Sequence, residues 1–333
     1  MMVELDIKNR AIQYVLSKIE AKSQEWGRFL VNDSFNNLDT RLTFWAIEED
    51  ARDLKEVALT PLGEQPELEL KLTYAPPSFF LEVLDGHNSP YWQVATVYRV
   101  LNNSEIIYDP KGRLNEWVSR IKQIEWDPDV IQLKQKTTLS LLQRVEKFIG
   151  EDMLADAYIW LIKAAEEAIC VPLMRQNTFG LGSAPLLLDT LRDHHADIFI
   201  FFKSLLRIET FTMEKLEESR KELEILADRL YLNNIKTDRE MWILAAFVAL
   251  NESEKRLKQS IAAKEYDLNL SNRLFETSIG ELWQAYFLVA QNPRTEVKLD
   301  PWVVGSFWKW FGYPEINEKW FQQNFSMIKD LIK

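Results

Sequence analysis

Cysteine is almost absent from this sequence, since Cys170 is the only one among 333 residues. A single thiol cannot form a disulfide within the chain, and it cannot build a zinc site from several thiolates. This cysteine usage is typical of a reducing compartment, and we expect the protein to be cytoplasmic.

Glycine and proline are also scarce, at 10 and 12 residues, whereas 47% of the residues are hydrophobic and 27% are charged. This composition excludes a disordered chain and indicates a helix-rich globular protein. The chain is longer than one hydrophobic core usually supports, so we expect two domains.

Basic residues are in deficit, because 40 Lys and Arg stand against 51 Asp and Glu and give a formal net charge of −11. Nucleic-acid binding takes most of its affinity from clustered Lys and Arg, so we expect no nucleic-acid partner. The longest apolar run, Met241–Leu250, is far shorter than the roughly 20 residues that cross a bilayer. The polar start, MMVELDIKNR, also lacks the apolar segment of a signal peptide, and we expect no membrane association.

Helical and strand patterns alternate up to about residue 126. Apolar residues at helical spacing from Ile7 to Ile19 predict a first helix that ends near Gly27. In ELELKLTY, three leucines alternate with charged residues, which predicts a strand with one buried face. The other expected elements are strands at Phe29–Val31, Leu42–Ile47 and EIIY, and helices at about Glu49–Val57, from Ser78 as the cap to Leu84, in PYWQVATVYRVL and from Leu114.

The rest of the chain has helical patterns almost throughout. The composition changes at Trp126-Asp127-Pro128, so we expect an α+β domain with a small mixed sheet at 1–126 and an all-helical bundle domain at 127–333. The expected helices are Val130–Ile149, Met153–Met174, Leu186–Leu206, Met213–Leu232, Arg239–Ala263 and Leu274–Ala290.

The order and spacing of these elements over roughly residues 10–175 resemble the nucleotidyltransferase superfamily, and in particular the aminoglycoside (streptomycin/kanamycin) adenylyltransferases. In that family a Gly-Ser pair after the first strand cradles a phosphate. An Asp-x-Asp on the next strand and a third carboxylate on a later strand bind magnesium. The metal ions bridge the triphosphate and the attacking oxygen in an in-line displacement.

The residues that match the phosphate and metal positions of this family depart from its pattern. Asp33 and Ser34 match the Gly-Ser pair, and Arg41 and Thr43 match the Asp-x-Asp. The resemblance therefore implies nucleotide-binding positions at Ser34, Arg41 and Thr43 in a degenerate site. An arginine at position 41 can contact an anionic ligand directly in place of a metal ion.

A rearranged metal set is the alternative that the resemblance leaves open. Asp39 would serve in a shifted register, together with Glu67 and Glu69 on the charged face of ELELKLTY. Oxygen ligands of this kind suit magnesium. Magnesium and ATP are the expected cofactors if the protein is active.

The resemblance also places a general base in the helical domain. The matching helix is AYIWLIKAAEEAICVPLM, in which Glu166 or Glu167 is the candidate. The alternative interpretation is a solvated glutamate with Lys163 one turn before it.

Acidic and histidine side chains gather around Asp193-His194-His195, with Asp189 and Asp197 nearby. Adjacent histidines on one helix point about 100° apart, so they do not serve one metal site easily. We interpret this segment as solvated helix surface.

Aromatic residues crowd the last forty positions, from Trp302 to Phe325. Large aromatic side chains anchor a terminus well because each buries a large area. We expect the tail to cap the bundle, and rank a contact surface for a second subunit next and a ligand platform third.

Together these observations predict a catalytically degenerate nucleotidyltransferase-like protein that binds a small molecule or a protein partner in the cleft between its domains. One alternative is an active magnesium-dependent adenylyltransferase that modifies a small hydroxyl compound, as the aminoglycoside enzymes do. The other is a non-enzymatic partner or antitoxin-like protein. A homodimer is also compatible with the sequence.

Overall fold

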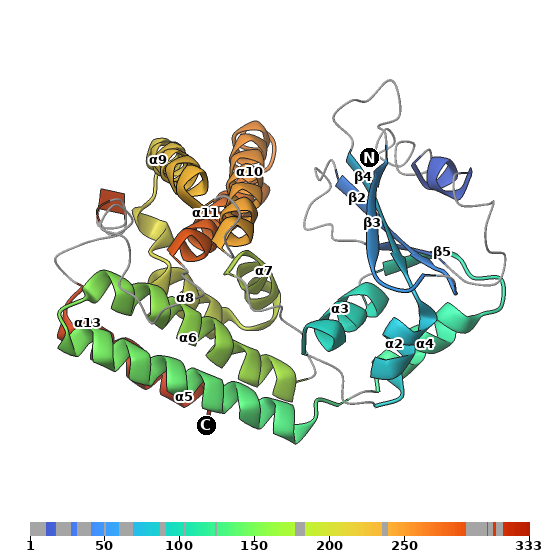
Figure 1. Cartoon of the computed structure of the whole chain (residues 1–333), viewed down its shortest axis with the longest axis horizontal. Coiled ribbons are helices and arrows are strands. Elements are labelled where there is room, and N and C mark those ends of the chain that lie inside the picture. The colour runs from blue at the N-terminus through green and yellow to red at the C-terminus, as the bar shows by residue number, and fades with distance from the viewer. Residues whose placement is uncertain are drawn as a thin grey trace. The chain divides into compact units, whose positions relative to one another are not determined.

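The computed structural model divides the chain into two compact units, Met1–Glu125 and Trp126–Lys333, here called the sheet unit and the helical unit (Figure 1). The residues that it describes are 11–17, 28–31, 41–49, 51–59, 69–86, 91–102, 104–123, 125–176, 184–234, 239–290, 305, 309–310 and 316–333. Because the structure combines a small mixed sheet in its first part with a bundle of helices after it, the predicted α+β class with an all-helical second part is confirmed.

The sheet unit is built on five strands in the order β3-β4-β2-β1-β5. The neighbours β2 and β4 are parallel and the other three pairs are antiparallel, so the sheet is mixed. The strands are β1 Arg28–Val31, β2 Arg41–Ile47, β3 Lys55–Leu59, β4 Glu69–Ala75 and β5 Ser104–Tyr108.

Both faces of this sheet are covered, because successive side chains of a strand point to opposite faces. In β2, Phe44 and Ala46 pack in a cluster with Ala11 and Val15 of the helical stretch 11–17. Trp45 and Ile47 of the same strand belong to a second cluster that includes residues of the three helices after β4. Those helices are α2 Pro77–Leu84, α3 Tyr91–Asn102 and α4 Arg113–Ile121.

Two local predictions in the sheet unit are wrong. The segment expected as a helix at Glu49–Val57 ends in the first three residues of strand β3, which pairs antiparallel with β4 along its length. Pairing with the edge of β4 satisfies the backbone of KEVAL, and this gain overrides the weak helical pattern. Ser78 does not cap α2, because the helix already begins at Pro77, and its N-cap residue is Pro76 without a side-chain hydrogen bond.

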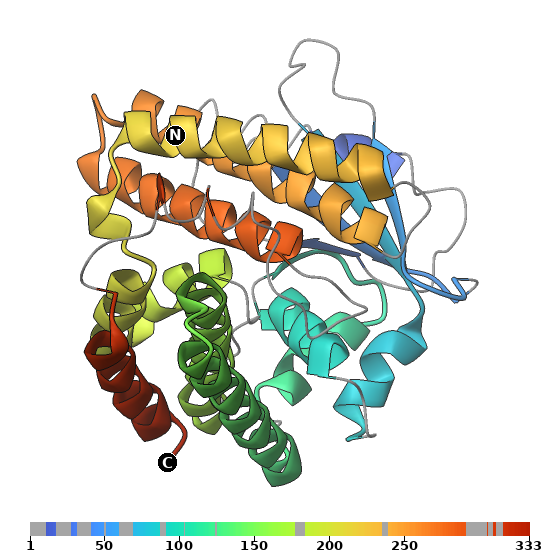
Figure 2. The same ribbon diagram turned by 60° about the vertical axis from the view of Figure 1, so that its left-hand side comes forward.

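The helical unit has one continuous hydrophobic core. Buried residues from Leu142 to Ile332 contribute to it. Within this unit, α9, α10 and α11 lie side by side (Figure 2). The helices are α5 Pro128–Gly150, α6 Leu154–Arg175, α7 Ala184–His194, α8 Ala196–Leu205, α9 Met213–Asn234, α10 Arg239–Ala263, α11 Leu268–Ala290 and α13 Glu318–Leu331.

Two pairs of serines, seven residues apart along each helix, join α10 to α11 by hydrogen bonds. The hydroxyls of Ser253 and Ser278 each donate to the other residue's carbonyl, at 2.9 and 2.6 Å. Ser260 and Ser271 form the same reciprocal pair, with both distances 2.8 Å. All four side chains are buried, so each hydroxyl finds its partner without water.

Gly280 of α11 allows α7 to approach closely. A Cβ at this position would lie 3.0 Å from the N and Cα atoms of Pro185. We expect Gly280→Ala to cost about 1–3 kcal/mol of unfolding free energy, because a helix backbone cannot yield as a flexible side chain does. Urea unfolding followed by circular dichroism measures the cost. Gly150→Ala is the control, since a Cβ there would meet nothing within 4 Å, and an equal effect of both changes would contradict the prediction.

Two helix predictions in this unit need correction, and one helix was not predicted. The single helix expected at Leu186–Leu206 is two helices, α7 and α8, with His195 between them in a non-helical conformation. Helix α11 begins at Leu268, six residues before the predicted Leu274, because Asp267 accepts the backbone N–H of Leu270 and caps it. The tail contains α13, which the aromatic pattern did not predict.

The described part of the aromatic tail packs on the bundle. Phe321, Phe325 and Ile328 of α13 are buried in the main core, as is Trp310. Trp302, Phe307, Trp308, Phe311 and Tyr313 lie outside the described residues. For α13 and Trp310, capping of the bundle describes the packing.

None of the helices in the described part of the chain combines the length and the apolar character that crossing a bilayer requires. The apolar run Met241–Leu250 lies in α10, where Ile243, Ala246 and Leu250 are buried in the bundle.

Candidate functional site

The register of the sheet sets the predicted nucleotide and metal positions beside one another. Strands β2 and β4 are parallel neighbours, and Arg41 stands opposite Glu69 while Thr43 stands opposite Lys71. Thr43 is buried, with 8% of its side chain exposed. The strand that matches Asp-x-Asp and the strand expected to hold the third carboxylate therefore start side by side.

The other predicted residues of this site are not described to the same extent. Ser34, Asp39 and Glu67 lie outside the described residues, as does Asp33. For Arg41 and Glu69 only the backbone is described, and the pairing of β2 with β4 gives their positions in the sheet.

The candidate bases of the helical unit both lie in ion pairs on α6. Lys163 Nζ is 2.9 Å from Glu166 Oε2, and Lys134 Nζ of α5 is 2.5 Å from Glu167 Oε2. Glu166 is buried, with 4% exposed, and Glu167 is half-buried. The interpretation of Glu166 as a solvated residue is therefore wrong, although its predicted neighbour Lys163 does pair with it.

Burial and the attraction of opposite charges act against each other on the pKa values of this pair. Burial raises the pKa of Glu166, against the opposing effects of the Lys163 ammonium and the backbone N–H of Ala184. Burial lowers the pKa of Lys163, but the carboxylates of Glu166 and Glu167 outweigh it, so the pKa of Lys163 is raised. Glu166 thus joins α6 to the first residue of α7. Its role as a general base stays a prediction.

We expect Glu166→Gln to gain stability relative to the unchanged protein as the pH rises from about 4.5 to 7. A carboxyl whose pKa is raised in the folded state keeps its proton there after the unfolded chain has released it. The free energy of unfolding therefore falls with pH in that window, and glutamine removes this fall. Urea unfolding at pH 4, 5, 6 and 7 measures the difference.

Glu217→Gln is the matched control for this pH dependence. Glu217 is an exposed residue of α9 whose pKa is lowered by its hydrogen bond to Lys221, so its contribution has the opposite sign. A relative loss of stability in Glu166→Gln with rising pH would mean that Lys163 and the Ala184 N–H stabilise an ionised Glu166.

The acidic cluster around the histidines is not all solvated surface. Asp189 of α7 has 2% of its side chain exposed, and its Oδ1 accepts from Arg273 Nε of α11 at 3.0 Å. Arg192 lies 3.9 Å from the same oxygen and pairs with Glu276 of α11 at 2.5 Å. The surface interpretation holds for the exposed Asp197 but is wrong for Asp189.

Burial also acts on the pKa of Asp189, raising it, while Arg273 and Arg192 oppose this rise. The sequence did not reveal Arg273 as the partner of Asp189, or Glu276 as the partner of Arg192. The spacing of Arg273 and Glu276, three residues apart on α11, is the signal that could have marked them, because it puts two charges on one helix face.

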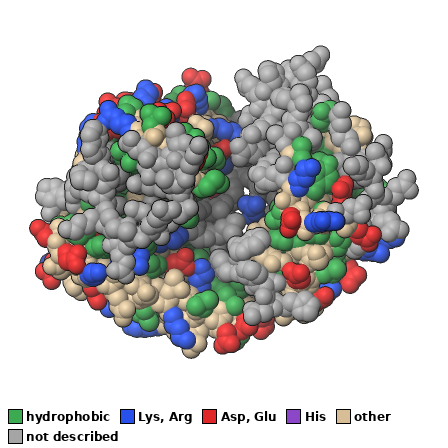
Figure 3. Space-filling model, viewed as in Figure 1, with side chains coloured by type: hydrophobic (Ala, Val, Ile, Leu, Met, Phe, Trp, Pro, Cys, Tyr) green, Lys and Arg blue, Asp and Glu red, His purple; other side chains and the backbone are tan. Residues whose placement is uncertain are grey.

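No group of three or more His, Cys, Asp or Glu able to hold a metal ion occurs among the residues that the structure describes. On the face drawn in Figure 3, acidic and basic side chains of the described residues are interspersed and do not separate by sign.

No protein-family model matches this sequence, and no curated protein matches it. Among solved structures, the chain is similar to a nucleotidyltransferase-like protein from Exiguobacterium sibiricum 255-15. The two share 12% sequence identity with a TM-score of 0.38, over 61% of this chain and 68% of the other. A similarity of this size carries no conclusion about activity.

Proposed function

We propose that this chain is a nucleotidyltransferase-like protein whose sheet unit binds an anionic small molecule, such as a nucleotide, without magnesium and without turnover. The observation that carries the proposal is the register of β2 and β4. It gathers Arg41, Thr43, Glu69 and Lys71 at the start of two neighbouring strands.

The charges of these four residues support an anionic ligand over a pair of metal ions. Arg41 and Thr43 stand at positions where two-metal chemistry would need carboxylates, and Glu69 is the one acidic residue of the four. Arginine binds phosphate and carboxylate groups with two parallel hydrogen bonds and needs no metal ion between. Arg41 is accordingly the residue that we assign to the ligand.

Calorimetry of the full chain with ATP tests the proposal. We expect affinity for ATP to be unchanged by EDTA, and to fall about tenfold in Arg41→Gln, because hydrogen bonds to charged groups contribute about 1.5–3 kcal/mol. Arg52→Gln is the control, since Arg52 is an exposed residue in the loop before β3.

Three results would contradict the proposal. These are an affinity that rises at least about tenfold with magnesium, transfer of AMP to an acceptor hydroxyl, and ATP binding that is too weak to detect at millimolar concentration. The first two would instead support the active enzyme with Asp39, Glu67 and Glu69 as its metal set.

A further inference from the structure

A cavity of about 330 Å³ opens in the helical unit, where the end of α10 meets the starts of α9 and α11. Its apolar wall is formed by Phe211, Met213, Leu268 and Phe275. Phe211 is largely buried, whereas Leu268 is 60% exposed, so the wall runs from the core to the surface. The volume lies at the lower end of the range for small-molecule sites.

Two opposite charges stand in the lining of this cavity. Glu214 is in the first turn of α9 and Lys264 follows the last residue of α10. Hydrogen bonds from its own backbone N–H and from Thr212 lower the pKa of Glu214, and the charge of Lys264 lowers it further. Within the described residues, neither Glu214 nor Lys264 forms an ion pair. The two charges in the lining are thus not neutralised by an ion pair in that part of the chain, although the Glu214 carboxylate accepts the two hydrogen bonds.

We propose that this cavity binds a small zwitterion with an apolar body, of the class of a free amino acid with an aromatic side chain. The ligand's ammonium group pairs with Glu214, its carboxylate pairs with Lys264, and its ring lies on the apolar wall. A purely anionic ligand would be repelled by Glu214, and a purely cationic ligand by Lys264. Two phenylalanines in the wall favour an aromatic ring, because ring pairs gain beyond their buried area.

The site is independent of the function proposed for the sheet unit, because all its residues belong to the helical unit. Its test therefore does not depend on nucleotide binding.

L-phenylalanine is the probe, titrated into the full chain and followed by ligand-observed NMR. We expect saturable binding that weakens about fivefold in Lys264→Gln and in Glu214→Gln, because each change removes one of the two solvent-exposed charge pairs that the ligand would form. Two analogues separate the charges. Binding of 3-phenylpropionate, which lacks the ammonium group, should not weaken in Glu214→Gln, and binding of phenethylamine, which lacks the carboxylate, should not weaken in Lys264→Gln.

Lys221→Gln is the matched control, because Lys221 is an exposed lysine of α9 that pairs with Glu217 and is not part of the cavity wall. Both cavity changes are at exposed residues, and circular dichroism checks that the helices are retained. The proposal is overturned if L-phenylalanine shows no saturable binding up to about 10 mM, if both cavity variants bind it as tightly as the control, or if either analogue binds as tightly as L-phenylalanine.

Discussion

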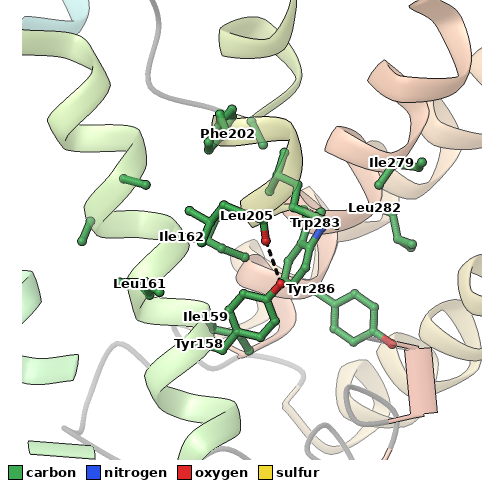
Figure 4. Packing of buried hydrophobic residues seen from close by; sticks show 14 of the residues in the cluster. Tyr158, Ile159, Leu161, Ile162, Phe202, Leu205, Ile279, Leu282, Trp283 and Tyr286 are labelled. Atoms are coloured by element: carbon green, nitrogen blue, oxygen red, sulfur yellow. Dashed lines mark hydrogen bonds between the residues drawn. The ribbon is translucent and has the colours of Figure 1, made fainter. Parts of the chain in front are cut away.

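Replacing Tyr158 by alanine is expected to destabilise the helical unit by about 3–5 kcal/mol, the largest effect that we predict. Tyr158 of α6 is fully buried at the centre of the core drawn in Figure 4. Its ring packs edge-on against Trp283 of α11 and Trp320 of α13, with centroids 5.5 and 5.1 Å apart. Alanine would leave a cavity bounded by three helices that cannot all close on it. Urea unfolding followed by circular dichroism measures the loss.

Tyr158→Phe separates the ring from the hydroxyl. The hydroxyl donates to the carbonyl oxygen of Leu205 at the end of α8, at 2.7 Å. Phenylalanine keeps the packing and leaves that carbonyl without its donor, which should cost about 1–2 kcal/mol. Tyr266→Ala is the control, because Tyr266 is 63% exposed. If Tyr158→Ala costs no more than Tyr158→Phe, the packing argument is wrong.

The second large effect is expected at Asp189. Removing its carboxylate by Asp189→Ala leaves Arg273, one quarter of which is exposed, without the 3.0 Å partner of its Nε. Breaking a fully buried pair costs about 3–5 kcal/mol, and partial solvation of Arg273 reduces the expected loss to roughly 2–4 kcal/mol. The measurement is again urea unfolding at pH 7.

A double-mutant cycle tests whether this loss comes from the pair. We expect Asp189→Ala and Arg273→Ala together to cost at least about 1 kcal/mol less than the sum of the two single changes. The exposed pair Glu217 and Lys221 provides the control cycle, for which we expect a much smaller coupling because solvent screens both charges. Additive losses at Asp189 and Arg273 would show that the ion pair does not contribute.

The sequence predicted long helices better than it predicted the breaks between helices and the short strands. The predicted helix Arg239–Ala263 agrees with α10 at both ends, because its pattern continues through seven turns. The break at His195 has no glycine or proline to mark it. Strand β3 was missed because it lies along the edge of β4, and a pairing partner more than ten residues away is invisible to a local pattern.

For the candidate sites too, the sequence predicted some features and missed others. The resemblance indicated which strands should carry the nucleotide and metal positions, and the register then set Arg41 beside Glu69. Sequence alone could not show that Glu166 is buried, because a glutamate near a lysine is most often solvated. The cavity at the start of α9 was missed as well, because its wall joins three helices that are consecutive in sequence but whose ends meet only in space.

The sequence by itself determined the class of the fold and the type of most elements, because periodicity and composition act within a few residues of each position. It also determined that the chain has a single thiol and that positions 41 and 43 hold no carboxylate. The tertiary structure alone decided which charges are buried. Asp189 meets Arg273, 84 residues away, only when α7 packs on α11, and the free energy of a charge depends on the partners and solvent around it.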